Sequence, residues 1–147
     1  LLARGADRVT ALDVGRGQLH PRLAADPCVD AREGVNARDL PADLAPPDWI
    51  TADLSFISLA KALPPALALA RPGARLVALV KPQFEAGPAA VGKGGVVRDP
   101  AVHAAVRTEI RAYLESEGWR VLGETESPIL GADGNREFLI AAEKPDA

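Results

Sequence analysis

Charged residues stand at the ends of several apolar stretches of this sequence. Asp13 and Asp53 each close a short stretch rich in strand-forming residues, and Lys81 closes the most continuous apolar run. Glu137 opens the last apolar run. A lysine near carboxylates can serve as a general base or as a donor that orients a reacting oxygen. Charged residues at strand ends often do no more than face solvent. That interpretation is sufficient for any one of these residues, but it explains four of them at one edge less well.

The elements that would position these residues follow from the residue pattern. Strands are expected at residues 8–14, 28–32, 48–54, 75–81, 119–126 and 137–142. Helices are expected at 18–25, 59–70 and 100–117, and Pro64 leaves open a later start for the second. The last two strands have no helix between them and should be antiparallel neighbours. This order predicts an α/β fold, a Rossmann-like doubly wound sheet with a reversed last strand.

Such a sheet would gather the charged residues at one edge. In open α/β sheets, ligands bind beyond the carboxyl ends of the parallel strands. Asp13, Asp53 and Lys81 would all lie at that edge. A reversed final strand begins at the same edge, which adds Glu137 to the group. The sequence therefore predicts one polar site there.

Length and composition limit the classes of function. The 147 residues fit one domain, and 48% hydrophobic with 25% charged residues is typical of a folded chain. A net charge of −3 gives no general attraction to nucleic acid or anionic membranes, so any RNA binding must be local or come from another part of a larger protein. One cysteine and the lack of an apolar run of about 18 residues predict a cytoplasmic protein without a membrane partner.

Four motifs carry a resemblance to a known family. They are DLSFISL at 53–59, LVKPQFEAG at 79–87, VGKGGVVRD at 91–99 and GNREFL at 134–139. Their order and length resemble the TlyA (hemolysin A) family, whose members are FtsJ-like, S-adenosylmethionine (AdoMet)-dependent ribosomal RNA 2′-O-methyltransferases. The resemblance extends from Arg4 to about Glu143.

The resemblance implies a catalytic Lys-Asp-Lys-Glu tetrad. Asp53 would be its aspartate, Lys81 its second lysine and Glu137 its glutamate. The first lysine, the glycine-rich AdoMet motif and a ribosomal-protein-type RNA-binding domain would all precede Leu1. Residues 1–147 would then be the C-terminal portion of a methyltransferase domain, inactive by itself and without its first, central strand. We therefore expect a break in strand pairing beside residues 9–14.

The same resemblance implies ligand-binding residues. Asp13 and Asn36 match positions expected to bind the ribose and the adenine of AdoMet, and Asp53 would also face this cofactor. Ribosomal RNA or ribosomal subunits would be the partners. The glycine-rich loop 87–98 would form a lid over RNA, with Lys93 and Arg98 on phosphates, although an ordinary surface loop is the simpler alternative. Arg136 is a third candidate RNA contact.

Several alternatives to this interpretation exist. Residues 87–93 fit the G-x-x-x-x-G-K part of a phosphate-binding loop, but Gly94 stands where Ser or Thr is needed. The two histidines lack neighbours at metal-ligand spacing, so no metal site is expected. An FtsJ-like enzyme acting on another RNA, a non-catalytic RNA- or ribosome-binding fragment and a hemolysin-like protein are the remaining alternatives.

Overall fold

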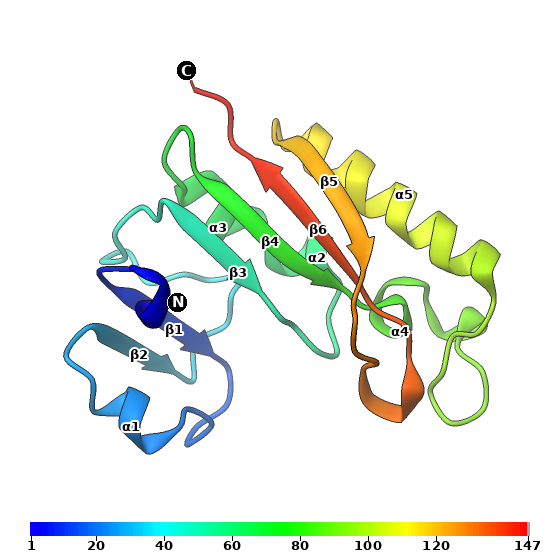
Figure 1. The fold of residues 1–147 in the computed structure, drawn as a ribbon, viewed down its shortest axis with the longest axis horizontal. Helices are drawn as coiled ribbons and strands as arrows, with labels where there is room; N and C mark the ends of the chain where they lie inside the picture. Colours follow the sequence, from blue (N-terminus) through cyan, green and yellow to red (C-terminus); the bar gives the residue numbers. More distant parts are fainter. Residues whose placement is uncertain (147) are drawn as a thin grey trace. The chain divides into compact units, whose positions relative to one another are not determined.

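The computed structural model describes residues 1–146, which form two units that are considered separately. The first unit, residues 1–44, opens with a 3-10 turn at Leu2–Arg4. It continues with strand β1 (Val9–Asp13), helix α1 (Pro21–Ala24) and strand β2 (Val29–Glu33). The two strands form a parallel pair in which Val9 lies opposite Val29 (Figure 1).

The second unit begins at residue 45 and contains a larger sheet. Its strands are β3 (Trp49–Ala52), β4 (Arg75–Val80), β5 (Arg120–Glu126) and β6 (Phe138–Glu143). Its helices are α2 (Leu59–Ala62), α3 (Pro64–Leu69), α4 (Pro82–Glu85) and α5 (Pro100–Ser116), with 3-10 turns at Pro88–Ala90 and Ala132–Gly134. The strand order is β3-β4-β6-β5. β3 and β4 are parallel, whereas β6 is antiparallel to both β4 and β5, which confirms the reversed last strand.

The core of the second unit lies between this sheet and its helices. On β4, Leu76, Ala78 and Val80 are buried, and the residues between them are more exposed. Helix α5 contributes Val106, Ile110 and Leu114, whose spacing forms one apolar stripe. Figure 1 shows α5 running beside β5 and β6. Burial of these apolar side chains stabilises the sheet. The sheet in turn holds the charged residues at the ends of its strands.

The helical segments differ from expectation in three places. The predicted helix at 59–70 consists of α2 and α3, which meet at Leu63 and Pro64, because a proline inside a helix removes a hydrogen bond and collides with the preceding turn. The predicted helix at 18–25 shrinks to the single turn α1, which Pro21 starts. The segment directly after Lys81, where the sequence predicts no helix, forms α4.

Strand pairing is interrupted where the sequence predicted a break. Among residues 1–146, β1 pairs only with β2, and β3 pairs only with β4. The described residues therefore form two sheets instead of one. In the larger sheet β3 is an edge strand, and Trp49 at its start is 50% exposed.

Candidate functional site

Lys81 lies at the carboxyl end of β4, beside the residues that follow β3. Its Nζ is 2.6 Å from Oδ1 of Asp53 and donates a hydrogen bond of 3.4 Å to Oγ of Ser55. These groups meet because β3 and β4 are parallel neighbours, with Ala52 opposite Ala78. The Lys81 side chain is 13% exposed and that of Asp53 is 70% exposed. The ammonium is thus mostly covered, while the carboxylate opens to solvent.

Glu137 directly precedes β6, the strand that pairs with β4. The antiparallel register ends with Val80 opposite Phe138, so Lys81 and Glu137 each lie one residue beyond this last pair. Glu137 is 8% exposed, and its Oε1 accepts a hydrogen bond of 2.9 Å from Nε2 of Gln83. A buried carboxylate needs such a donor because it has lost its hydration. The structure therefore brings Asp53, Lys81 and Glu137 to one edge of one sheet.

Helix α4 begins directly after Lys81, and it contacts residues that follow β3 as well as the residue that precedes β6. Pro82 occupies its first position, where the missing N–H costs nothing. The Phe84 ring lies 5.0 Å from the ring of Phe56, centroid to centroid, with the planes inclined by 52°. Glu85 Oε1 accepts a hydrogen bond of 2.8 Å from the backbone N–H of Leu59, the first residue of α2. One helical turn thus contacts the segment after β3 and the residue before β6.

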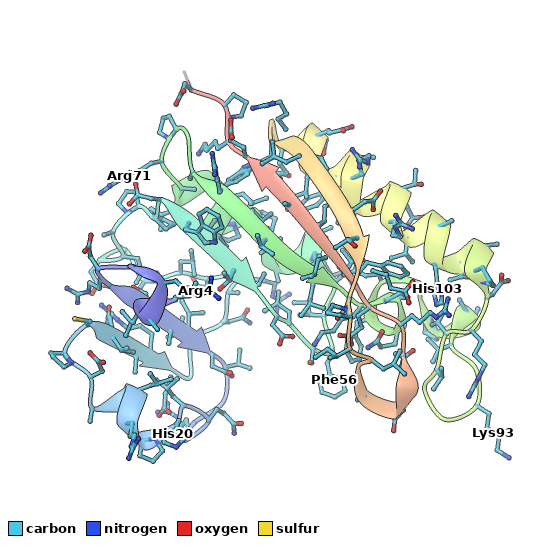
Figure 2. All side chains as sticks on the ribbon, viewed as in Figure 1. Arg4, His20, Phe56, Arg71, Lys93 and His103 are labelled. Atoms are coloured by element: carbon cyan, nitrogen blue, oxygen red, sulfur yellow. The ribbon has the colours of Figure 1, made fainter. Side chains whose placement is uncertain are left out.

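Phe56 places an aromatic ring on the surface near the Asp53–Lys81 ion pair. The residue is 90% exposed, and its φ of 64° lies in the left-handed region, which is rare for a residue with a Cβ. Figure 2 shows Phe56 beyond the ends of β3 and β4, on the same side as the loop between β5 and β6. Strained backbone of this kind is typical of functional positions. The ring offers a flat apolar surface one residue from Ser55.

The loop at 87–98 is attached to the start of β6 through one buried amide. Asn135 is 2% exposed, and its Oδ1 accepts from Val97 N at 3.1 Å. Its Nδ2 donates to the carbonyl oxygens of Gly95 and Ala132, at 3.0 and 3.2 Å. This arrangement anchors the C-terminal half of the loop two residues from Glu137.

The predicted RNA-contact residues are exposed in the second unit. Lys93 and Arg98 are exposed in the loop, and Lys93 points away from the rest of the unit (Figure 2). Arg136 is 60% exposed and lies 3.5 Å from Oε1 of Glu126. The residues after Lys93 do not form a helix, so the loop lacks the geometry of a nucleotide phosphate-binding loop.

The predicted cofactor residues Asp13 and Asn36 belong to the first unit. Asp13 ends β1, and its Oδ1 accepts a hydrogen bond of 2.7 Å from Gly15 N. Asn36 Oδ1 accepts from Arg38 N at 3.0 Å. Both side chains are exposed. An exposed carboxylate suits a pair of ribose hydroxyls, and an exposed amide suits the edge of an adenine base, so both residues fit the ligand predicted for them.

Sequence reasoning missed three residues of this site. Gln83 and Phe56 lie inside motifs that were recognised, but their roles depend on contacts between segments far apart in the chain. Asn135 lies inside the motif at 134–139, for which the sequence predicts no contact with the loop at 87–98. Its neighbours Gly134 and Gly131 marked a tight turn, which was the only signal that a side chain there could bond to backbone.

No helix within residues 1–146 has the length and apolar character needed to cross a bilayer. No group of three or more His, Cys, Asp or Glu in the same range could hold a metal ion.

Comparisons with known proteins give consistent relatives. The profile of the FtsJ-like methyltransferase family matches residues 1–144. The provisionally named rRNA methyltransferase YqxC of Bacillus subtilis is 46% identical over 95% of this chain and 50% of its own length. The 16S/23S rRNA (cytidine-2′-O)-methyltransferase TlyA of Mycobacterium tuberculosis is 44% identical over 95% and 53%. Hemolysin A of Brachyspira hyodysenteriae is 37% identical over 95% and 59%.

Solved structures agree with these relatives. A provisionally named hemolysin of Lactococcus lactis superposes with a TM-score of 0.93 at 40% identity, covering 97% of this chain and 70% of that one. The N-methyltransferase NodS of Bradyrhizobium japonicum, in complex with S-adenosylhomocysteine, has a TM-score of 0.63 at 14% identity, covering 99% and 70%. The second likeness concerns the Rossmann-like fold alone. The chain spans about half the length of the curated relatives it matches.

Proposed function

The chain belongs to the FtsJ-like methyltransferase family, and from that premise we propose that it is the catalytic part of an AdoMet-dependent ribosomal RNA ribose 2′-O-methyltransferase. The observation that carries the proposal is the Asp53–Lys81 ion pair at 2.6 Å, with Glu137 directly before β6, the strand that pairs with β4. The relatives named as rRNA methyltransferases support the choice of substrate. Such an enzyme would act in the cytoplasm, where ribosomes are found.

The proposed reaction is difficult because a neutral ribose hydroxyl is a weak nucleophile. AdoMet would supply the electrophilic methyl group. Lys81 would bind the 2′-oxygen and either accept its proton or stabilise the charge that develops on it. Asp53 holds the Lys81 side chain in place through the ion pair, and Glu137 would position the other cationic member of the tetrad. Orientation of the reacting atoms would provide much of the remaining rate.

Three residues would hold the cofactor. Asp13 would bind the ribose hydroxyls, Asn36 the adenine and Asp53 the part nearest the methyl group. The exposure and the available polar atoms of Asp13 and Asn36 support this assignment. The assignment predicts weaker AdoMet binding in Asp13→Ala, measured by calorimetry, with unchanged binding as the contradicting result.

The RNA would lie over the exposed ring of Phe56 and the loop at 87–98. Aromatic side chains bind unstacked bases of RNA by stacking, and Lys93, Arg98 and Arg136 offer charges for phosphates. The net charge of −3 gives no general attraction to RNA, so any RNA contact made by this chain itself must be local. Replacing Lys93 and Arg98 by alanine should lower RNA affinity and flatten its salt dependence, whereas unchanged binding would remove the lid from the proposal.

We also infer that catalysis needs residues outside these 147. The curated relatives are about twice as long as the matched region, and the family resemblance places a lysine, a glycine-rich motif and an RNA-binding domain before it. The chain would then be the C-terminal portion of the methyltransferase domain, and it would transfer no methyl group alone.

A fusion protein tests the function and the fragment hypothesis together. The part of M. tuberculosis TlyA outside the matched region would be joined to this chain, and transfer of labelled methyl groups to ribosomal subunits would be measured. The fusion should label rRNA at ribose, and Lys81→Ala or Glu137→Ala should abolish labelling. Exposed Lys61 provides a matched control, since Lys61→Ala should label normally. Full labelling by Lys81→Ala would contradict the site, and labelling by the 147-residue chain alone would contradict the fragment hypothesis.

A fusion that binds rRNA without labelling it would instead favour a non-catalytic ribosome-binding function. The name of the Brachyspira relative motivates a second control, lysis of erythrocytes by the purified protein. Lysis without methyl transfer would replace the proposed function.

A further inference from the structure

Two residues that have no role in the proposed function restrict the space around the carboxylate of Glu137. We propose that Gln83 and Gly131 are positioning residues, which together fix the direction in which the Glu137 carboxylate points. The inference rests on the proposed function, because it assumes that Glu137 acts in the site. It adds two residues that would control the rate without touching the substrate.

Gln83 confines the carboxylate from α4. Its Nε2 donates to Glu137 Oε1 at 2.9 Å, and its own Oε1 is buried without a hydrogen-bond partner among the described residues. The opposite amide orientation would place two oxygens against each other, so the donor must face Glu137. A buried amide oxygen without a partner is costly for stability. The Gln83 side chain is therefore better explained by its role in orienting Glu137 than by a contribution to the stability of the fold.

Gly131 confines the carboxylate from the loop between β5 and β6. A Cβ built on Gly131 would overlap Oε1 and Cδ of Glu137. The backbone of Gly131, with φ −74° and ψ −172°, is extended and open to any residue. Glycine is therefore not needed at this position for its conformation. Its missing side chain makes the space in which the Glu137 carboxylate lies.

The loop around Gly131 has little freedom to move aside. Gly131 N donates to Asn135 O at 2.8 Å, and the buried Asn135 side chain is bonded to Val97, Gly95 and Ala132. A methyl group at position 131 would meet the far end of the Glu137 side chain, which can rotate. Alanine at this position should therefore displace the carboxylate and leave the backbone in place.

Gly123 provides a matched control for this substitution. It also lies outside the positive-φ region, and a Cβ built on it meets nothing within 4 Å. Gly131→Ala and Gly123→Ala thus add the same methyl group in the same unit, once against Glu137 and once in open space. Gln83→Met is the companion variant, because it keeps the length of the side chain and removes the donor.

The first experiment uses nuclear magnetic resonance on the 147-residue chain and needs no activity. We expect the side-chain amide signals of Gln83 to shift in Glu137→Gln, and to shift similarly in Gly131→Ala, because both changes remove the bond to the carboxylate. Gly123→Ala should leave these signals unchanged. Unshifted Gln83 signals in a folded Gly131→Ala chain would overturn the proposal, whatever the outcome of any methyl-transfer assay.

The second experiment measures methyl transfer by the fusion protein described above. Gly131→Ala and Gln83→Met should each lower kcat at least about 10-fold, with the KM for ribosomal subunits and the melting temperature close to those of Gly123→Ala. A general structural defect would instead lower the melting temperature. Normal kcat in both variants, together with loss of activity in Glu137→Ala, would overturn the positioning roles and leave the proposed function intact. Normal activity in Glu137→Ala would contradict the proposed site itself.

Discussion

At the scale of single residues, the site combines one well-satisfied group with one strained group. Lys81 has two oxygen partners, Asp53 and Ser55, and is largely covered. Phe56 keeps a left-handed backbone and a 90% exposed ring, supported by a contact with Phe84. The first arrangement stabilises a charge, and the second keeps an aromatic surface available to a ligand.

Phe56 can be tested for this role by substitution with glycine. Glycine removes left-handed strain of about 1–2 kcal/mol but loses the contact with Phe84 and adds backbone freedom. We expect the free energy of unfolding to change by less than about 1 kcal/mol, whereas RNA affinity of the fusion protein should fall about 5- to 100-fold, as for loss of one stacked base. Phe56→Tyr should retain affinity. Equal affinity in the glycine variant would show that the ring does not contact RNA.

At the scale of elements, the sequence predicted long apolar segments well and short helices poorly. Residues 75–80 form β4 because a continuous apolar run suits a buried strand. Helix α5 starts at Pro100 because Asp99 accepts from Ala101 N, and Gly118, with φ 80°, follows it. Helix α4 was missed because four residues show no helical periodicity, and its contacts with Glu137, Phe56 and Leu59 exist only after folding.

The residues of the candidate site also divide into those that the strand pattern predicted and those that depend on contacts formed only after folding. Asp53, Lys81 and Glu137 were predictable because strand ends define a sheet edge. The ion pair itself was not, because a strand pattern places residues at an edge without fixing where a side chain points. Gln83 and Phe56 could not be found for the same reason.

Helix α3 depends on a lysine from the end of the sheet. Lys144 Nζ donates to the carbonyl oxygens of Leu67, Ala68 and Ala70, at 3.1, 3.1 and 2.7 Å. These oxygens lie at the C-terminus of α3, where a cation also interacts favourably with the helix dipole. Lys144→Met should therefore lower the free energy of unfolding by about 1–3 kcal/mol, measured by chemical denaturation. Lys61→Met should change it little, and equal effects of the two variants would exclude the capping role.

Glu85 makes the junction between α2 and α4 sensitive to pH. Burial raises the pKa of Glu85, the hydrogen bond from Leu59 N lowers it, and the nearby Glu109 carboxylate raises it, for a net increase above 4.5. The folded state thus holds this proton more tightly than the unfolded state, so stability is lost as pH rises from about 4.5 through the raised pKa.

Glu85→Gln should remove this contribution, since its amide oxygen can still accept from Leu59 N. The melting temperature of the variant relative to the unmodified chain should be lowest in acid and should increase toward neutral pH. Thermal unfolding at several pH values checks this. If the difference in melting temperature between the two chains stays constant with pH, burial of the Glu85 carboxylate does not destabilise the folded state.

At the scale of the whole molecule, the two units differ in how much they bury. None of residues 1–44, all of which the structure describes, is buried, whereas the second unit holds a core that includes Leu67, Leu76, Leu114 and Ile140. A two-stranded sheet with so little apolar burial is marginal by itself. Hydrogen exchange should therefore be fast at the amides of β1 and β2 and slow at those of β4, β6 and α5. Equal protection of both units would indicate one cooperative fold.

The single turn of α4 has a consequence for how this protein can vary in length. Lys81 contacts Asp53 just before α4, and three residues of α4, Gln83, Phe84 and Glu85, contact Glu137, Phe56 and Leu59. Within the helix each side chain is turned by about 100° from the one before. Many substitutions would alter one of these contacts, but inserting or deleting one codon would redirect every contact that follows it. The loop from 87 to 95, with exposed glycines and few bonds to other segments, can accept such changes. Length conservation in the first segment and length variation in the second should therefore mark the chains that retain the site.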